Sequence, residues 1–189
     1  MIAIRQETPF DVAGREALLD SAFGDCRFAK TAERLREGRL PAEDLSFAAC
    51  ADGRLIGTVR LWNIAAGPGR PALLLGPLAV EAEFRHGGIG GELMRHALAE
   101  AHQRGHQSVL LVGDAPYYGR FGFSTERTGA LTLPGPYARE RLLARELVPG
   151  VLEGARGLVR ATGRCERKTR VARRAGLLRQ DSIRASRAA

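Results

Sequence analysis

The feature that most restricts the fold of this chain is a glycine-rich segment that joins an apolar run to an amphipathic helix. Four glycines lie within five residues at 87–91, soon after the run LLLGPLAV at 73–80. So continuous an apolar run is typical of a strand buried on both faces. A strand that leads through a glycine-rich loop into a helix is the first half of a βαβ unit, whose two strands are parallel.

The rest of this unit follows from residue spacing. A helix is predicted to begin at Gly88 and to stop at Gly105, which suits a helix end. Its apolar residues recur every four positions, at Ile89, Leu93, Ala97 and Ala101. The run SVLLV at 108–112 then predicts the second buried strand.

The glycine-rich segment has the properties of a phosphate-binding loop. A helix N-terminus presents unpaired N–H groups and the positive end of the helix dipole. Without Cβ atoms, glycines let phosphate oxygens approach these groups closely. Arg85 adds a positive charge at the start of the loop. The segment 85–91 is therefore predicted to bind a phosphate-containing ligand.

Several phosphate-binding families do not fit this loop. A dinucleotide fingerprint counted from Gly88 and Gly90 would need a third small residue where Leu93 stands. A P-loop and a kinase strand both need a lysine in a specific setting. The chain has only two lysines, Lys30 and Lys168, and neither has that setting.

Further strands and a helix are expected around the βαβ unit. Asp52-Gly53 is a strong signal for a two-residue hairpin. Because proline cannot donate to a strand ladder, Gly76-Pro77 predicts a bulge within the strand 73–80. A first helix is expected from Pro9 to Gly24. The other expected segments are strands at 2–5, 46–51, 55–62, 121–125, 130–133 and 142–147, a short helix at 31–37 and a loop at 65–71.

The positive charge of the chain is concentrated at its C-terminal end. The net charge is +8, but residues 164–189 hold nine basic and two acidic side chains, so residues 1–163 carry only +1. We therefore expect a domain at 1–163 and a basic C-terminal extension at 164–189, either a frayed helix or disordered. The extension could contact nucleic acid or another polyanion weakly, or be a solvated segment without function.

Composition excludes several other classes of protein. Three cysteines without a C-x-x-C pair indicate neither a disulfide framework nor a zinc site, and they fit reduced thiols in a cytoplasmic protein. His102 and His106 have metal-ligand spacing but no evident third ligand, so no metal is expected. No apolar stretch reaches about 18 residues, so no membrane span is expected.

Two motifs together resemble the GCN5-related N-acetyltransferase (GNAT) superfamily. Arg85, Gly88 and Gly90 match R-x-x-G-x-G, the pyrophosphate loop of that family. The segment YYGRFGF at 117–123 is similar to its aromatic-Tyr-x-x-x-Gly-Phe motif. The local sequence around both motifs is most similar to the YhbS-like subgroup, and the resemblance covers about residues 1–160.

The resemblance implies an α+β fold, with a mixed, strongly curved sheet flanked by helices and a V-shaped splay between the fourth and fifth strands, which end at Val80 and Val112. It implies an acyltransferase that moves an acetyl group from the cosubstrate acetyl-CoA to a primary amine by direct attack in a ternary complex. Relatives are often dimers, so a homodimer is an expectation. The amine acceptor, a small molecule or a peptide, stays open.

The resemblance also implies roles for individual residues. Tyr118 would be the general acid that protonates the departing coenzyme A sulfur. Leu78, Ala79 and Val80 would line the pantetheine arm and receive the thioester carbonyl. The pyrophosphate would be held by Arg85, His86, Gly87, Gly88, Ile89, Gly90 and Gly91.

Two points remain open at this stage. The general base could be Glu81, Glu83, Asp114 or a water relay. The alternative function is a non-enzymatic acyl-CoA-binding protein whose basic extension contacts nucleic acid.

Overall fold

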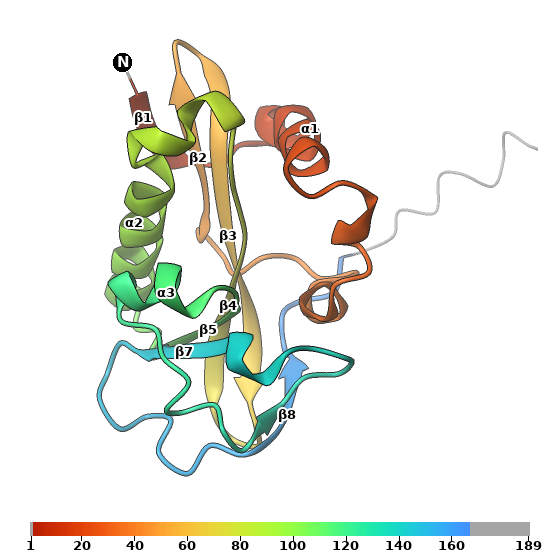
Figure 1. Ribbon diagram of the computed structural model, residues 1–189, viewed down its shortest axis with the longest axis vertical. Helices are drawn as coiled ribbons and strands as arrows, with labels where there is room; N and C mark the ends of the chain where they lie inside the picture. The colour runs from red at the N-terminus through yellow and green to blue at the C-terminus, as the bar shows by residue number, and fades with distance from the viewer. Residues whose placement is uncertain (1, 167–189) are drawn as a thin grey trace, which may run out of the picture.

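A computed structural model describes residues 2–166 of the protein (Figure 1). The strands are β1 (Ile2–Gln6), β2 (Ser46–Ala51), β3 (Arg54–Ala66), β4 (Pro71–Val80), β5 (Ser108–Val112), β6 (Leu131–Thr132), β7 (Leu142–Glu146) and β8 (Gly157–Ala161). The helices are α1 (Val12–Phe23), α2 (Ile89–Gln103) and α3 (Ala115–Tyr118). Short 3-10 turns are η1 (Pro9–Asp11), η2 (Asp25–Arg27), η3 (Thr31–Leu35), η4 (Ala82–Gly87), η5 (Gly119–Phe121) and η6 (Arg139–Arg141).

The strands form one mixed sheet with the order β1-β2-β3-β4-β5-β7, and β8 pairs with both β3 and β6. The pair β4–β5 is parallel, while the pairs β1–β2, β2–β3, β3–β4 and β5–β7 are antiparallel. Helix α2 lies on one side of the sheet and α1 on the other (Figure 1). This arrangement confirms the expected α+β class and the βαβ unit formed by β4, α2 and β5.

The hairpin between β2 and β3 forms where it was predicted. Asp52 and Gly53 have φ values of 48° and 82°. Two consecutive residues with positive φ are the requirement for a type I′ turn, whose twist matches that of the flanking strands. Strand β3 then continues to Ala66, so its first half pairs with β2 and its end pairs with β8.

The predicted bulge in β4 is also present. Val59 pairs with Leu78 and Leu61 pairs with Leu75, so Gly76 and Pro77 together oppose the single residue Arg60. The indole Nε1 of Trp62 donates a buried hydrogen bond of 2.6 Å to the carbonyl oxygen of Gly76. The bulge is therefore fixed from the neighbouring strand, β3.

Beyond this region, β4 and β5 separate. They pair only through Leu73 with Val109 and Leu74 with Leu110, although β4 continues for six more residues to Val80. The N–H groups on the β5 side of β4 lose their partner strand there. This is the V-shaped splay expected between the fourth and fifth strands, and it gives the fold an opening inside the sheet.

Both helices are held by apolar contacts that the periodicity predicted in part. In α2 the expected residues Ile89, Leu93, Ala97 and Ala101 are all buried in one cluster with the sheet. In α1, Leu18 and Leu19 pack against Ala79 of β4. Val12, expected on the apolar side of α1, is 43% exposed because it lies in the first turn, beyond the edge of that contact.

The structure corrects two expectations about secondary structure and adds two elements. The expected loop at 65–71 shrinks to 67–70, because β3 and β4 extend into it as one long hairpin. The expected strand at 121–125 is instead a 3-10 turn followed by an isolated bridge at Ser124, since α3 and η5 use this segment to turn the chain. Helix α3 and strand β8 were not expected. No described helix is long and apolar enough to cross a membrane.

The first residues of the expected basic extension pack on the domain. The carbonyl oxygen of Arg164 accepts a 2.8 Å hydrogen bond from the N–H of Leu40, and the N–H of Glu166 donates a 2.9 Å bond to the carbonyl oxygen of Gly38. The described structure therefore continues past residue 163. The expectations for 167–189, including contact with nucleic acid, lie outside the described residues.

Two truncations test where the folded domain ends. Removal of 167–189 should change the melting temperature by only a few degrees, because this segment is strongly self-repelling and has few apolar residues. Removal of 164–189 also deletes the two bonds to Gly38 and Leu40, which should lower the stability by about 1–3 kcal/mol. Thermal unfolding of both proteins checks this, and equal melting temperatures would contradict it. Removal of 167–189 should also eliminate most of the binding of the protein to heparin, which is a polyanion.

Candidate active site

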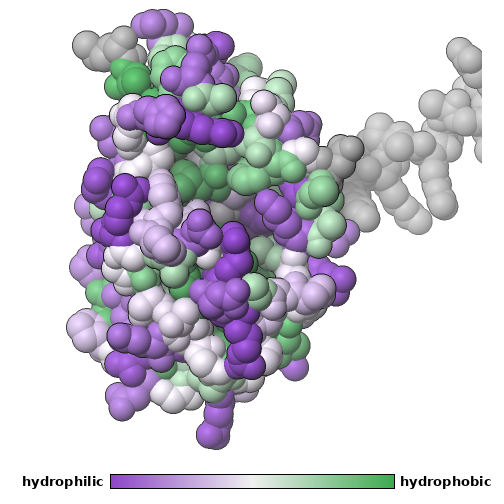
Figure 2. Space-filling view, viewed as in Figure 1, coloured by the Kyte–Doolittle hydropathy of each residue, from purple (hydrophilic) through white to green (hydrophobic). Residues whose placement is uncertain are grey.

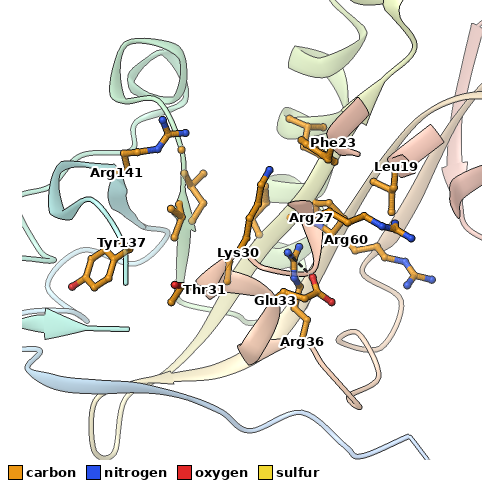
Figure 3. Close-up of a pocket in the computed structure, with 18 of the residues that line it drawn as sticks. Leu19, Phe23, Arg27, Lys30, Thr31, Glu33, Arg36, Arg60, Tyr137 and Arg141 are labelled. Atoms are coloured by element: carbon orange, nitrogen blue, oxygen red, sulfur yellow. Dashed lines mark ion pairs between the residues drawn. The ribbon is translucent and has the colours of Figure 1, made fainter. Parts of the chain in front are cut away.

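The splay between β4 and β5 opens into a cleft of about 820 Å³. Strand residues 75–78 and 111–112 line it from the sheet, α1 and the segment 27–36 form one wall, and α3 and the segment 136–141 form the other. Figure 2 shows apolar surface in a hollow near the middle of this face, framed by hydrophilic side chains. The cleft therefore lies between chain segments that are far apart in the sequence (Figure 3).

The glycine-rich segment forms the expected helix N-terminus. Turn η4 spans Ala82–Gly87, and Gly88 then adopts φ 78° as the residue that precedes α2. The N–H groups of Gly91 and Glu92 both donate to the carbonyl oxygen of Gly88. Ile89 and Gly90 are the first two residues of α2, so no carbonyl oxygen of this helix accepts a bond from their N–H groups. Arg85, His86, Gly87 and Gly88 are all exposed, so a ligand can reach this backbone.

The glycine-rich loop does not line the cleft, but two side chains connect the two places. A Cβ atom on Gly90 would lie 3.0 Å from the hydroxyl of Tyr117 and 3.7 Å from Cγ2 of Val80. Tyr117 also lines the cleft. Gly90 therefore lies next to Val80, at the end of β4, and next to Tyr117 of the cleft wall.

Two further arginines, Arg95 and Arg120, lie near this loop, and the sequence analysis assigned no role to them. Gly91 lies beside Arg95 and the ring edge of Phe121. The guanidinium groups of Arg95 and Arg120 lie 5.8 and 5.4 Å from the centre of the Phe121 ring. Neither arginine has a carboxylate partner within residues 2–166. The i, i+4 spacing of Gly91 and Arg95 was the available signal, since it places Arg95 on the same face of α2.

Tyr118 lies at the C-terminal end of α3 and lines the cleft. Its ring packs against the backbone of Gly113, where a Cβ atom would lie 2.1 Å from Cε2 of the tyrosine. Tyr117 and Phe123 contact the same ring edge-on, at centroid distances of 4.9 and 6.2 Å. Burial, followed by the influence of Tyr117, raises the pKa of Tyr118 to about 12. The phenol is therefore neutral at pH 7 and can donate a hydrogen bond into the cleft.

The close contact at Gly113 predicts the effect of a single methyl group. Gly113→Ala forces the Tyr118 ring out of its place, so kcat should fall about 10-fold or more, with a loss of stability of about 1–3 kcal/mol. The control is Gly119→Ala, because Gly119 has helical φ and no atom near the added Cβ. Steady-state kinetics and thermal unfolding check both variants. A Gly113→Ala protein with unchanged kcat would contradict this placement of Tyr118.

The structure places the three carboxylates that are candidate bases in different surroundings. Glu81 and Glu83 both pair with Arg54 of the β2–β3 hairpin, at 2.9 Å for Glu81, and neither lines the cleft. The hydrogen bond from Arg54 lowers the pKa of Glu83, which makes this carboxylate a weaker base. Asp114 lines the cleft directly before α3, and its carboxylate lies 3.4 Å from Arg141.

The three residues expected to line the pantetheine arm differ in their surroundings: one lines the cleft and one lies in the core. Leu78 is half-buried and lines the cleft, while Ala79 is buried against α1. Val80 is half-buried, and its carbonyl oxygen accepts a long 3.4 Å hydrogen bond from Nε of Arg85. These three residues therefore lead from the glycine-rich loop toward the bulge at Gly76.

The wall formed by 27–36 brings charged residues into the cleft that sequence reasoning did not single out. Lys30, Glu33 and Arg36 line it, together with Arg141 from the opposite wall (Figure 3). The only sequence signal was a short helix expected at 31–37, which η3 confirms in shorter form. No group of three or more potential metal ligands occurs among residues 2–166, and Cys26, Cys50 and Cys165 are free thiols.

Comparison with known proteins gives a consistent result. Residues 13–123 match the family model of the Acetyltransferase (GNAT) family. The uncharacterized N-acetyltransferase YhbS of Escherichia coli strain K12 is 30% identical over 157 residues, which cover 82% of this chain and 93% of YhbS.

Solved structures agree with these sequence relationships. The crystal structure of YhbS from Escherichia coli in complex with CoA matches with a TM-score of 0.72 and 30% identity, covering 88% of this chain and 96% of that one. A GNAT family acetyltransferase from Brucella melitensis in complex with acetyl-CoA matches with a TM-score of 0.59 and 26% identity, covering 79% and 90% of the two chains.

Proposed function

Because the chain belongs to the acetyltransferase (GNAT) family, we propose that it transfers an acetyl group from acetyl-CoA to a primary amine by direct attack in a ternary complex. The observation that carries this proposal is the splay of β4 and β5, with Tyr118 in its cleft and the glycine-rich loop connected to it through Tyr117. When the pyrophosphate binds at the glycine-rich loop and the rest of the molecule extends past Gly90 and Tyr117, the thioester lies in the cleft beside Tyr118.

The cosubstrate is held mainly by backbone groups. The loop at 85–91 binds the pyrophosphate at the N-terminus of α2 through N–H groups that the helix leaves without an acceptor, those of Ile89 and Gly90, and Arg85, Arg95 and Arg120 add positive charge around it. The pantetheine arm runs along Leu78, Ala79 and Val80. N–H groups of β4 that face away from β3 then donate to the thioester carbonyl, since β5 no longer pairs with them there. Such preorganised donors stabilise the oxygen on which negative charge develops.

The reaction forms a C–N bond and breaks a C–S bond. The neutral amine attacks the carbonyl carbon, the tetrahedral intermediate collapses, and the coenzyme A thiolate leaves. Tyr118 donates its proton to the sulfur, and the nitrogen releases one proton, which restores the phenol through solvent. Because a thiol has a pKa of about 8.5, complete transfer from a phenol of pKa about 12 is uphill. Tyr118 therefore acts first by donating a hydrogen bond to the sulfur as negative charge develops on it.

The attacking amine must be neutral, so its ammonium proton must be removed. Asp114 supports this role because, of the three candidate carboxylates, it is the one that lines the cleft. Its carboxylate is 73% exposed, so water can bridge it to the amine. We assign Asp114, acting directly or through water, as the base.

A thiol-release assay tests the proposed function. The purified full chain is supplied with acetyl-CoA and a panel of primary amines, and free coenzyme A is measured over time. Release should require both the protein and an amine, and mass spectrometry should detect the N-acetylated amine. Reactions without amine control for hydrolysis. Tight acetyl-CoA binding with no amine-dependent release across small amines, amino acids and peptides would instead favour a non-enzymatic acyl-CoA-binding protein.

A further inference from the structure

The cleft carries an excess of positive charge. Six cationic and three acidic side chains line the cleft, and several of the cations are neutralised locally. Arg15 and Arg60 share the buried carboxylate of Glu7, and Arg27 pairs with Glu16. The other three cations are Lys30, Arg36, which pairs with Glu33, and Arg141, which contacts Asp114. We call these three residues the cationic trio.

Lys30 has no carboxylate partner within residues 2–166. Its ammonium group lies 4.2 Å from the centre of the Phe23 ring, at the edge of the cleft. Burial, followed by the positive charges of Arg36 and Arg141, lowers the pKa of Lys30. Arg36 and Arg141 thus both repel Lys30, and a bound anion would relieve this repulsion.

Arg36 is the buried member of the trio, with only 9% of its side chain exposed. Its Nη2 lies 2.9 Å from Oε2 of Glu33, but its Nε is buried without a hydrogen-bond partner in the described structure. Its Nη1 lies beside the Gly76 bulge of β4. A buried N–H without an acceptor is costly, so an oxygen supplied by a ligand would stabilise this arrangement.

Arg141 faces Lys30 from the opposite wall of the cleft (Figure 3). Its 3.4 Å contact with Asp114 joins side chains that are 50% and 73% exposed, so this ion pair neutralises little of its charge. Lys30 and Arg36 come from the segment after α1, and Arg141 comes from just before β7. An anion between the walls can therefore contact groups from both sides.

On the basis of the proposed function, we infer that the acceptor is an amine that also carries an anionic group, either a carboxylate or a phosphate, held by Lys30, Arg36 and Arg141. The phosphates of acetyl-CoA do not account for the trio, because the glycine-rich loop at 85–91 lies outside the cleft lining. Nη1 of Arg36 lies beside Gly76, two positions along β4 from Leu78, which lines the proposed path of the pantetheine arm. An acceptor with a few bonds between amine and anion can therefore reach both places.

Matched pairs of acceptors test the inference. β-Alanine is compared with β-alaninamide, and O-phosphoethanolamine with ethanolamine, at saturating acetyl-CoA. The anionic member of at least one pair should have a kcat/KM at least about 10-fold higher than its neutral partner. The pair with the larger ratio identifies a carboxylate or a phosphate as the recognised group. Equal or higher kcat/KM for both neutral members would overturn the inference.

Variants that each remove one positive charge test whether the cationic trio causes the preference for anionic acceptors. Lys30→Gln and Arg141→Gln should each raise KM for the preferred anionic acceptor about 5-fold or more, with KM for acetyl-CoA within about twofold. The control is Arg104→Gln, which removes the same charge at the far end of α2, where Arg104 pairs with Glu100 and Asp44. If Lys30→Gln raised KM for acetyl-CoA instead, the trio would belong to the cosubstrate site and the inference would be wrong.

Calorimetry separates this inference from the proposed function. β-Alanine and O-phosphoethanolamine are titrated into protein saturated with coenzyme A. Binding that Lys30→Gln weakens about 5-fold, with no turnover of any amine, would support the anion site while contradicting the transferase. Turnover of neutral amines without binding of either anionic probe would contradict the anion site alone.

Discussion

Tyr118→Phe is expected to lower kcat about 10- to 10³-fold, the range for loss of a general acid. The substitution removes only the hydroxyl that we propose faces the departing sulfur, and it leaves the ring packed against Gly113. Affinity for acetyl-CoA should hardly change, because the proposed site for its phosphates is the glycine-rich loop. Burial raises the pKa of Tyr118 to about 12, so the phenol stays protonated at neutral and moderately basic pH. The loss should therefore be constant from about pH 6 to about pH 9.

The measurement is the steady-state rate of coenzyme A release, after single-turnover kinetics show that chemistry limits kcat. Tyr137→Phe is the matched control, since this tyrosine also lines the cleft but its hydroxyl donates to the carbonyl oxygen of Leu131 at 3.2 Å. The control should keep kcat within about threefold. Full kcat in Tyr118→Phe would rule out the role of its hydroxyl in the chemical step.

Gly88→Val is expected to weaken the binding of coenzyme A about 10- to 100-fold. Gly88 has φ 78°, which a β-branched residue adopts only with strain, so the loop must rearrange its N–H groups. Loss of one hydrogen bond to a charged phosphate costs about 1.5–3 kcal/mol, which corresponds to this range of affinity. Isothermal calorimetry with coenzyme A measures the effect directly.

The control for this substitution is Gly105→Val at the other end of α2. Gly105 has φ 81°, and an added Cβ meets no atom within 4 Å at either glycine. Both variants should therefore lose similar stability, while Gly105→Val keeps its affinity for coenzyme A. Unchanged affinity in folded Gly88→Val protein would mean that the pyrophosphate binds elsewhere.

Local patterns in the chain were sufficient to predict the strands and the helix that position the cosubstrate. The hairpin at Asp52-Gly53, the bulge at Gly76-Pro77 and helix α2 each depend on neighbouring residues, whose backbone preferences act over a few positions. The two glycine-rich motifs likewise identified the acetyltransferase family, which the sequence and structure comparisons confirm. The roles of Tyr118 and of the loop at 85–91 remain functional predictions.

The acceptor side of the cleft could not be predicted in the same way, because long-range packing creates it. Arg141 lies more than a hundred positions from Lys30 and Arg36, and it meets them only because η3 and the segment before β7 close on the splayed strands. The ion pairs of Arg54 with Glu81 and Glu83 also depend on the placement of the β2–β3 hairpin. Residue spacing specifies local backbone geometry, whereas the net charge of a cleft depends on which distant side chains neutralise one another. In this protein the cosubstrate side follows from local sequence, and the acceptor side follows from the assembled fold.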